Sequence, residues 1–67
     1  MNLTRRQEQV LGLVALGLTW DEIGYELGIS PHTAKHHTDL LRRLFKVEKK
    51  RHLTAHARVY FGRPHPR

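Results

Sequence analysis

Apolar residues recur along this chain at spacings of three and four rather than two, which predicts helices and little β-structure. At the start of the first such segment, Thr4 and Gln7 have the form of a capping box, in which a hydroxyl and an amide side chain satisfy early backbone groups. Gly17 is the residue type typical just past a helix C-terminus. We therefore predict a first helix over about residues 5–16.

A second segment repeats this pattern and leads into a sharp turn. Thr19 and Glu22 form another capping box, and the short helix that follows is expected to run through Leu27. Gly24 lies inside this helix, where glycine costs about 0.5–1 kcal/mol relative to alanine. So unfavourable a residue indicates that another part of the backbone passes close by. Gly28 follows where the turn needs a positive φ.

The third and fourth segments complete the pattern. Ser30 is a predicted N-cap with Pro31 at the first helical position, and this helix should reach about Phe45. Its inward positions are predicted to be Ala34, Thr38, Leu41 and Leu44. After a charged bend we expect a fourth helix near residues 50–60, whose apolar stripe is Leu53, Ala57 and Tyr60.

Two short helices joined by a three- or four-residue turn that contains glycine form the helix-turn-helix pattern. The fold class predicted here is all-α, a small four-helix helix-turn-helix domain over residues 1–61. Residues 62–67 are expected to be a disordered basic tail. Because Met1 directly precedes the first helix signal, a free-standing domain is expected.

Composition narrows the choice of partner. The 67 residues carry 12 Lys and Arg against 6 Asp and Glu, a formal net charge of +6, which favours nucleic acid or an anionic membrane surface. Cysteine is absent, so disulfides and thiolate zinc sites are excluded. No apolar run resembles a signal peptide or approaches the roughly 20 residues of a membrane span. We expect a cytoplasmic protein with no membrane partner.

The third helix carries the candidate chemistry. A recognition helix presents its N-terminal residues to base edges while neighbouring groups hold phosphates. The outward residues that could contact bases are His32, Lys35, His36 and Asp39. The candidates for backbone contacts are Ser30, Thr33, Arg42 and Arg43. The alternative is that all of these are ordinary solvated side chains. Trp20 either covers the core or rests against sugar and phosphate, and packing is favoured.

Metal and enzyme chemistry are not favoured. Two histidine pairs have the i, i+4 spacing of helical zinc sites, His32 with His36 and His52 with His56, but neither has a third ligand or an accompanying glutamate. Ser30 is the only serine, and its place before a proline is that of an N-cap. We predict no catalytic residue, no metal and no cofactor.

Together these residues resemble the LuxR/GerE-type helix-turn-helix domain of bacterial transcription regulators. The match begins with "LTRRQEQVLGLVALGLTWDEIGYELGISPHTAKHH" and continues through "LLRRL", over about residues 3–44. The resemblance implies a four-helix domain whose third helix enters the major groove, with Lys35, His36 and Asp39 facing it. It also adds His37, beside Thr33, to the backbone contacts. The fourth helix commonly forms a homodimer interface, which would here involve Leu53, His56, Val59 and Tyr60.

The chain departs from the family pattern at several positions. Gly24 stands where alanine is usual, Ala34 where valine is usual, and Asp39 where a basic or neutral polar residue is usual. The segment "FKVEKKR" between the third and fourth helices is longer than in the family. The target sequence and the register of the fourth helix are therefore not carried over.

The function expected from the sequence is specific binding of double-stranded DNA by a small stand-alone transcriptional regulator, bacterial or phage, acting as a homodimer. Two alternatives remain open at this point. One is a sigma-factor region 4-like domain, although the third helix lacks its basic "SR..RAR" continuation. The other is a protein-interaction module that docks on RNA polymerase or another regulator. A membrane-surface helix is weaker, because the apolar stripe of the third helix is already committed to the core.

Overall fold

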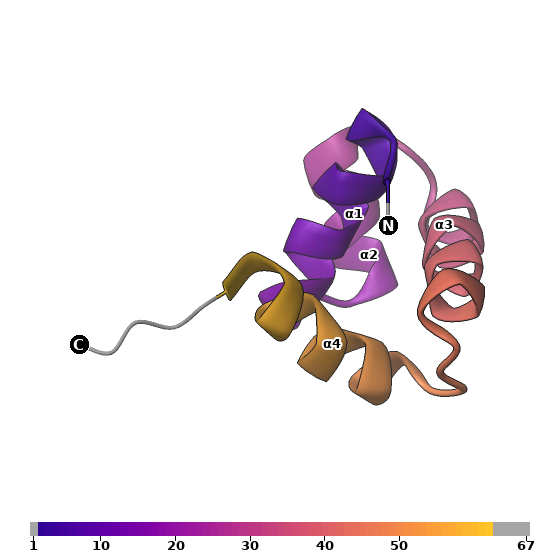
Figure 1. The fold of residues 1–67 in the computed structure, drawn as a ribbon. Coiled ribbons are helices and arrows are strands. Elements are labelled where there is room, and N and C mark those ends of the chain that lie inside the picture. The colour runs from indigo at the N-terminus through magenta and orange to yellow at the C-terminus, as the bar shows by residue number, and fades with distance from the viewer. Residues whose placement is uncertain (1, 63–67) are drawn as a thin grey trace.

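The computed structural model describes residues 2–62 and contains four helices in the predicted order (Figure 1). They are α1 (Arg5–Ala15), α2 (Trp20–Leu27), α3 (Pro31–Phe45) and α4 (Lys50–Gly62). No strand occurs in residues 2–62. The predicted all-α helix-turn-helix fold is confirmed, and α4 extends two residues further than predicted. The predicted tail lies outside the described residues, except for Gly62, which closes α4.

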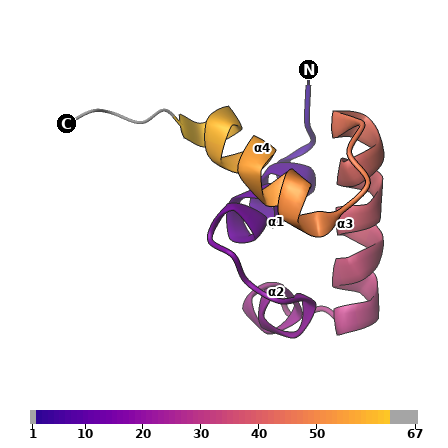
Figure 2. The same ribbon diagram turned by 90° about the horizontal axis from the view of Figure 1, so that it is seen from below.

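The helices enclose one core and leave one long face of α3 outside it. α1 packs against α4 and α3, and α2 packs against α3. Figure 2 shows α3 along one side of the molecule, with its start beside α2 and its end beside α4. The three other helices therefore meet the inner face of α3.

The core is small and almost wholly apolar. The fully buried apolar side chains are Val10, Leu11, Val14, Ile23, Ala34, Leu41, Leu53 and Ala57. Thr38 is the one buried polar residue among residues 2–62, at 1% exposure. Every helix contributes to this set, so none of the four can be removed without opening the core.

Two predicted core positions are wrong. Leu44 is 42% exposed, and Phe45 packs against the core in its place. At about 100° per residue, Phe45 returns to the direction of Ala34 while Leu44 is turned well away from it. Tyr60, predicted in the apolar stripe of the fourth helix, is 38% exposed and lies at the edge of the core.

The predicted helix punctuation is present. Both capping boxes form: Thr4 with Gln7 and Thr19 with Glu22 exchange backbone and side-chain hydrogen bonds of 2.8–3.2 Å. Gly28 has the expected positive φ of 69°. α3 ends at Phe45 as predicted, but its C-cap carries no glycine signal, because the left-handed position is taken by a non-glycine residue, Lys46, at φ 58°.

Gly24 marks a close approach, as its unfavourable position indicated. A Cβ built there would lie 2.6 Å from the Ile29 carbonyl oxygen and 3.2 Å from the Ser30 carbonyl carbon. These are backbone atoms of the turn between α2 and α3, which a side chain cannot displace cheaply. The absence of a Cβ thus lets the turn close over α2.

We predict that Gly24→Ala destabilises the domain by about 1–3 kcal/mol, because overpacking against backbone outweighs the gain in helix propensity. Gly12→Ala is the matched control, since its Cβ would lie 3.9 Å from the Phe61 ring, an ordinary contact. That control should be neutral or stabilising by up to about 1 kcal/mol. Urea unfolding followed by circular dichroism measures both. Equal or higher stability of Gly24→Ala would contradict the close approach.

Candidate nucleic-acid interface

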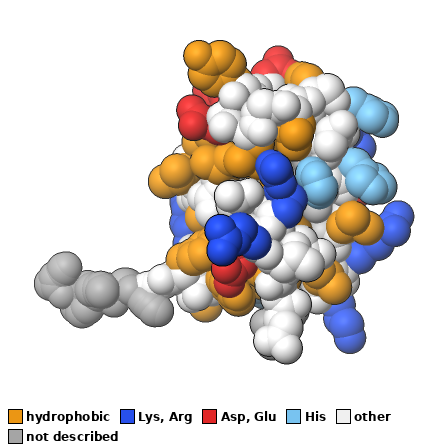
Figure 3. Space-filling model, turned by 90° about the horizontal axis from the view of Figure 1, so that it is seen from above, with side chains coloured by type: hydrophobic (Ala, Val, Ile, Leu, Met, Phe, Trp, Pro, Cys, Tyr) orange, Lys and Arg blue, Asp and Glu red, His pale blue; other side chains and the backbone are white. Residues whose placement is uncertain are grey.

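The outward face of α3 carries most of the residues that the sequence singled out. His32, Lys35, His36 and Arg43 are exposed, whereas Thr33, His37, Asp39 and Arg42 are half-buried. Histidine and basic side chains gather along the side of the molecule that α3 occupies (Figure 3). The structure thus brings the candidate base contacts and backbone contacts together on one helix face.

The N-terminus of α3 is arranged to attract an anion. Ser30 Oγ accepts a 3.0 Å hydrogen bond from the Thr33 amide and donates one of 2.9 Å to Thr33 Oγ1. No acidic residue lies in the first turn, so the positive end of the helix dipole is not neutralised there. Free backbone amides at such a terminus are suited to a phosphate oxygen.

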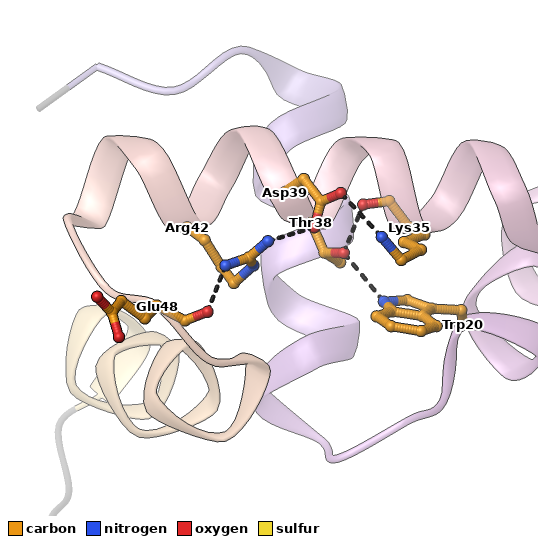
Figure 4. A network of polar contacts seen from close by, with 6 residues as sticks. All are labelled: Trp20, Lys35, Thr38, Asp39, Arg42 and Glu48. Atoms are coloured by element: carbon orange, nitrogen blue, oxygen red, sulfur yellow. Dashed lines mark hydrogen bonds and ion pairs between the residues drawn. The ribbon is translucent and has the colours of Figure 1, made fainter.

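Asp39 joins two cations on this face. Its Oδ2 lies 3.2 Å from Lys35 Nζ and its Oδ1 lies 2.7 Å from Arg42 Nη2 (Figure 4). The hydrogen bond from Arg42 lowers the pKa of the Asp39 carboxyl below its ordinary 3.8; partial burial opposes this shift, and Lys35 adds to it. A lowered pKa stabilises the fold above the ordinary value and ceases to do so as pH falls through the folded-state value. Both pairs are therefore intact at neutral pH.

Arg42 also ties α3 to the segment that leads into α4. Its Nη1 donates to the backbone carbonyl of Glu48, while Nη2 holds Asp39. Both terminal nitrogens are thus engaged within the protein. Arg43, one residue on, is exposed and directed to solvent. The two neighbouring arginines differ in what they can offer a phosphate, a difference that helical periodicity alone did not reveal.

Trp20 packs rather than standing free, as favoured from the sequence. Its Nε1 donates to Thr38 Oγ1 at 3.0 Å, and the Thr38 hydroxyl donates to the Lys35 carbonyl at 2.8 Å. The Lys35 ammonium lies 5.3 Å from the centre of the Trp20 ring, within range of a cation–π contact. The start of α2 is therefore bonded to the middle of α3. Sequence reasoning missed this role of Thr38, although a threonine in an apolar stripe was a signal for it.

Within residues 2–62 the histidine side chains are not gathered with further metal-binding groups. His36 and His37 have ring centroids 6.3 Å apart, but no group of three or more metal-binding side chains occurs in the part of the chain that is described. A pair of imidazoles without further ligands does not make the four-coordinate site that zinc prefers.

The predicted dimer residues on α4 lie in three different environments. Leu53 is fully buried in the core, so its inclusion in an interface is wrong; a domain this small needs the inner face of α4 for its own core. His56 and Val59 are exposed. Tyr60 is partly used internally, because its hydroxyl donates to Glu8 Oε2 at 3.2 Å and its ring meets Phe45 edge-on.

A separate surface lies on α2, where a shallow groove is lined by Leu18, Asp21, Glu22, Tyr25 and Glu26. Half of the six acidic residues of the chain line this groove. Tyr25 is 86% exposed within it. The negative charge is thus concentrated on α2 and the positive charge elsewhere.

None of the described helices is long and apolar enough to cross a membrane.

Comparison with known proteins agrees with the resemblance found in the sequence. The family described as bacterial regulatory proteins, luxR family, matches residues 1–57. The matched range includes α1, α2, α3 and α4 as far as its last buried residue, Ala57. No curated protein and no solved structure matches the chain.

The contrast between the two arginines gives a prediction about stability. We expect Arg42→Ala to lower the free energy of unfolding by about 1–2 kcal/mol, because it leaves the Glu48 carbonyl and Asp39 Oδ1 without this donor, while Asp39 Oδ2 keeps Lys35. Arg43→Ala, at an exposed position, should stay within about 0.5 kcal/mol of the unmodified protein. Chemical denaturation compares them. Equal midpoints for the two variants would show that the Arg42 contacts contribute nothing.

Proposed function

The chain belongs to the luxR family of bacterial regulatory proteins, and we propose that it recognises a specific duplex sequence through α3. Members of this family are DNA-binding transcription regulators rather than enzymes. In this proposal α3 lies in the major groove and its N-terminal half contacts base edges. Family membership also sets aside the sigma-factor region 4-like alternative.

One observation supports this proposal: the outer face of α3 is free of the core and carries exposed histidine and basic side chains, which are able to contact bases and phosphates. Lys35 suits guanine O6 and N7, and an imidazole such as that of His36 donates or accepts at a purine edge. His32 extends the same face toward the helix N-terminus, and Asp39 extends it in the other direction. These four residues are the proposed base contacts.

The proposed backbone contacts flank them. Ser30 and Thr33 lie beside the amides at the start of α3, which attract phosphate, and the half-buried His37 lies one turn beyond Thr33. Arg43 is exposed toward the other end of the helix, and among residues 2–62 its guanidinium has no hydrogen-bond or ion-pair partner. Arg42 adds positive charge to this region, but its terminal nitrogens are occupied. We therefore assign the direct phosphate contact to Arg43 and a bracing role to Arg42.

We further propose that two copies associate through α4. The exposed residues on its outer face, His52, Ala55, His56 and Val59, follow the i, i+3, i+4, i+7 spacing of a helix–helix contact. Val59 is 76% exposed and offers apolar contact area for a two-helix contact on this face. Dimers of helix-turn-helix domains bind half-sites about one helical turn apart.

A second candidate function is favoured by the groove on α2. Its three carboxylates repel phosphate, and its exposed Tyr25 supplies apolar contact area. Such a surface suits a basic protein partner, for which RNA polymerase or another regulator are the candidates. This docking would accompany DNA binding rather than replace it, because the groove and the outer face of α3 are built from different residues.

The test of DNA recognition is an affinity selection from random duplexes with excess non-specific competitor. We expect a motif of two half-sites spaced by about 10 base pairs. Lys35→Ala should lose preference at one or two positions, whereas Arg43→Ala should keep the motif and reduce the dependence of log affinity on log salt by about one unit. If the unmodified protein yields no motif, sequence-specific recognition is refuted. A single half-site would keep recognition and remove the dimer.

Dimerisation is tested separately by changing Val59. Val59→Asp should convert a dimer into a monomer in analytical ultracentrifugation and weaken binding to a paired site more than to a half-site, because two carboxylates would face each other across a two-fold axis. Leu16→Asp is the control, since Leu16 is similarly exposed, at 72%, but lies at the end of α1. Equal effects of both changes would contradict an interface on α4.

A further inference from the structure

We propose that Asp39 determines the sequence preference of α3: it holds Lys35 and Arg42 in the DNA-free protein, and in the groove its carboxylate accepts a hydrogen bond from the N4 amino group of a cytosine. This inference rests on the proposed placement of α3 in the major groove. Beyond that placement, the inference names cytosine as the base that Asp39 selects and explains why an acidic residue lies on a surface proposed to contact DNA.

The first step is the engagement of the cations when no DNA is present. Asp39 contacts Lys35 Nζ at 3.2 Å and Arg42 Nη2 at 2.7 Å with different oxygens. Lys35 is flanked on its other side by the Trp20 ring, and Arg42 by the Glu48 carbonyl. Both cations therefore have defined positions before any ligand arrives, as Figure 4 shows.

The second step concerns phosphate. Any phosphate that takes the ammonium or guanidinium from Asp39 leaves a carboxylate close to the DNA backbone, where like charges repel. Non-specific contacts by Lys35 and Arg42 are thus opposed by the same residue that orders them. A neutral side chain at this position would free both cations for phosphate at any sequence.

The third step concerns the bases. A carboxylate only accepts hydrogen bonds, so it is repelled by guanine O6 and N7 and by thymine O4. Cytosine offers the N4 amino group as its hydrogen-bonding group in the major groove, whereas the adenine amino group lies beside the N7 acceptor. Cytosine is therefore the base best matched to a single carboxylate.

The fourth step joins Lys35 to the same base pair. The partner of a cytosine is guanine, whose O6 and N7 accept from a lysine ammonium. Lys35 and Asp39 already lie side by side as donor and acceptor. As a unit, they match the acceptors and the donor that a G·C pair presents in the major groove.

The experiment repeats the selection with three proteins: the unmodified chain, Asp39→Asn and Glu26→Gln. Glu26 is an exposed carboxylate on α2, so its variant has the same net charge as Asp39→Asn without touching α3. We expect a cytosine in each half-site for the unmodified chain and for Glu26→Gln. Asp39→Asn should shift that position to adenine, because an amide pairs with adenine N6 and N7.

A salt titration on random duplex provides the second measurement. Release of the two cations should raise the affinity of Asp39→Asn for random DNA several-fold and steepen the salt dependence by up to about two units, one for each cation that reaches a phosphate. Glu26→Gln should change the slope less, since it releases no cation on α3. The ratio of specific to non-specific affinity should fall about tenfold in Asp39→Asn, within the range expected for one base contact.

The outcomes separate this inference from the proposed function. A motif in the unmodified chain that Asp39→Asn leaves unchanged would overturn the role of Asp39 and leave DNA recognition intact. Absence of any motif in the unmodified chain would overturn both. If Asp39→Asn fails to fold by circular dichroism, Asp39→Glu decides: retained cytosine supports the proposal, and loss of it with a folded protein overturns it.

Discussion

The contact between α2 and the turn that follows it is the constraint on which the rest of the structure depends. Gly24 allows the backbone at Ile29 and Ser30 to approach a distance that any Cβ would prevent. The hydrogen bond from Trp20 to Thr38 joins the same two helices further along α3. With both contacts formed, α3 has one orientation relative to α2, and its outer face points away from the core. A binding surface on α3 thus requires no loop to order it.

A second constraint is the small number of residues available for the core. Each helix must bury its inner face, and α4 therefore gives Leu53 and Ala57 to the core. Only the outer face of α4 remains for a partner. Polar contacts strengthen this thin core at its edges, where Lys50 donates to the Leu18 carbonyl and Arg58 donates to the Ala15 carbonyl. These two basic side chains donate to backbone carbonyls near the end of α1 and before α2, so not all of the positive charge of the chain is available to a polyanion.

Much of the fold could be predicted because its signals are local. Capping boxes, the N-cap at Ser30 and the glycine at 28 depend on neighbours within four residues, and all of them formed. The differences have separate causes. The exchange of Leu44 for Phe45 follows from accumulated helical rotation, and the left-handed Lys46 lacks the glycine signal that marks most such ends. For the candidate site, composition and periodicity selected the candidate residues on α3, except His37, which the family resemblance added. They did not identify the engagement of Arg42 by Glu48, since that contact depends on the path of the segment between α3 and α4.

The charge distribution explains how one small surface can combine attraction with selectivity. The formal net charge of +6 draws the domain toward any polyanion, and this attraction carries no sequence information. Selectivity requires side chains whose unfavourable free energy at the wrong base exceeds the favourable free energy of contacting a phosphate. An acid paired with two cations has this property. When the ion pairs separate in the groove, each partner regains a hydrogen bond only at a base pair that offers a donor to the acid and an acceptor to a cation. The lowered pKa of Asp39 keeps the carboxylate charged, so the pairing persists at neutral pH. In the proposed complex, specific recognition depends as much on the Asp39 carboxylate as on the Lys, Arg and His side chains around it.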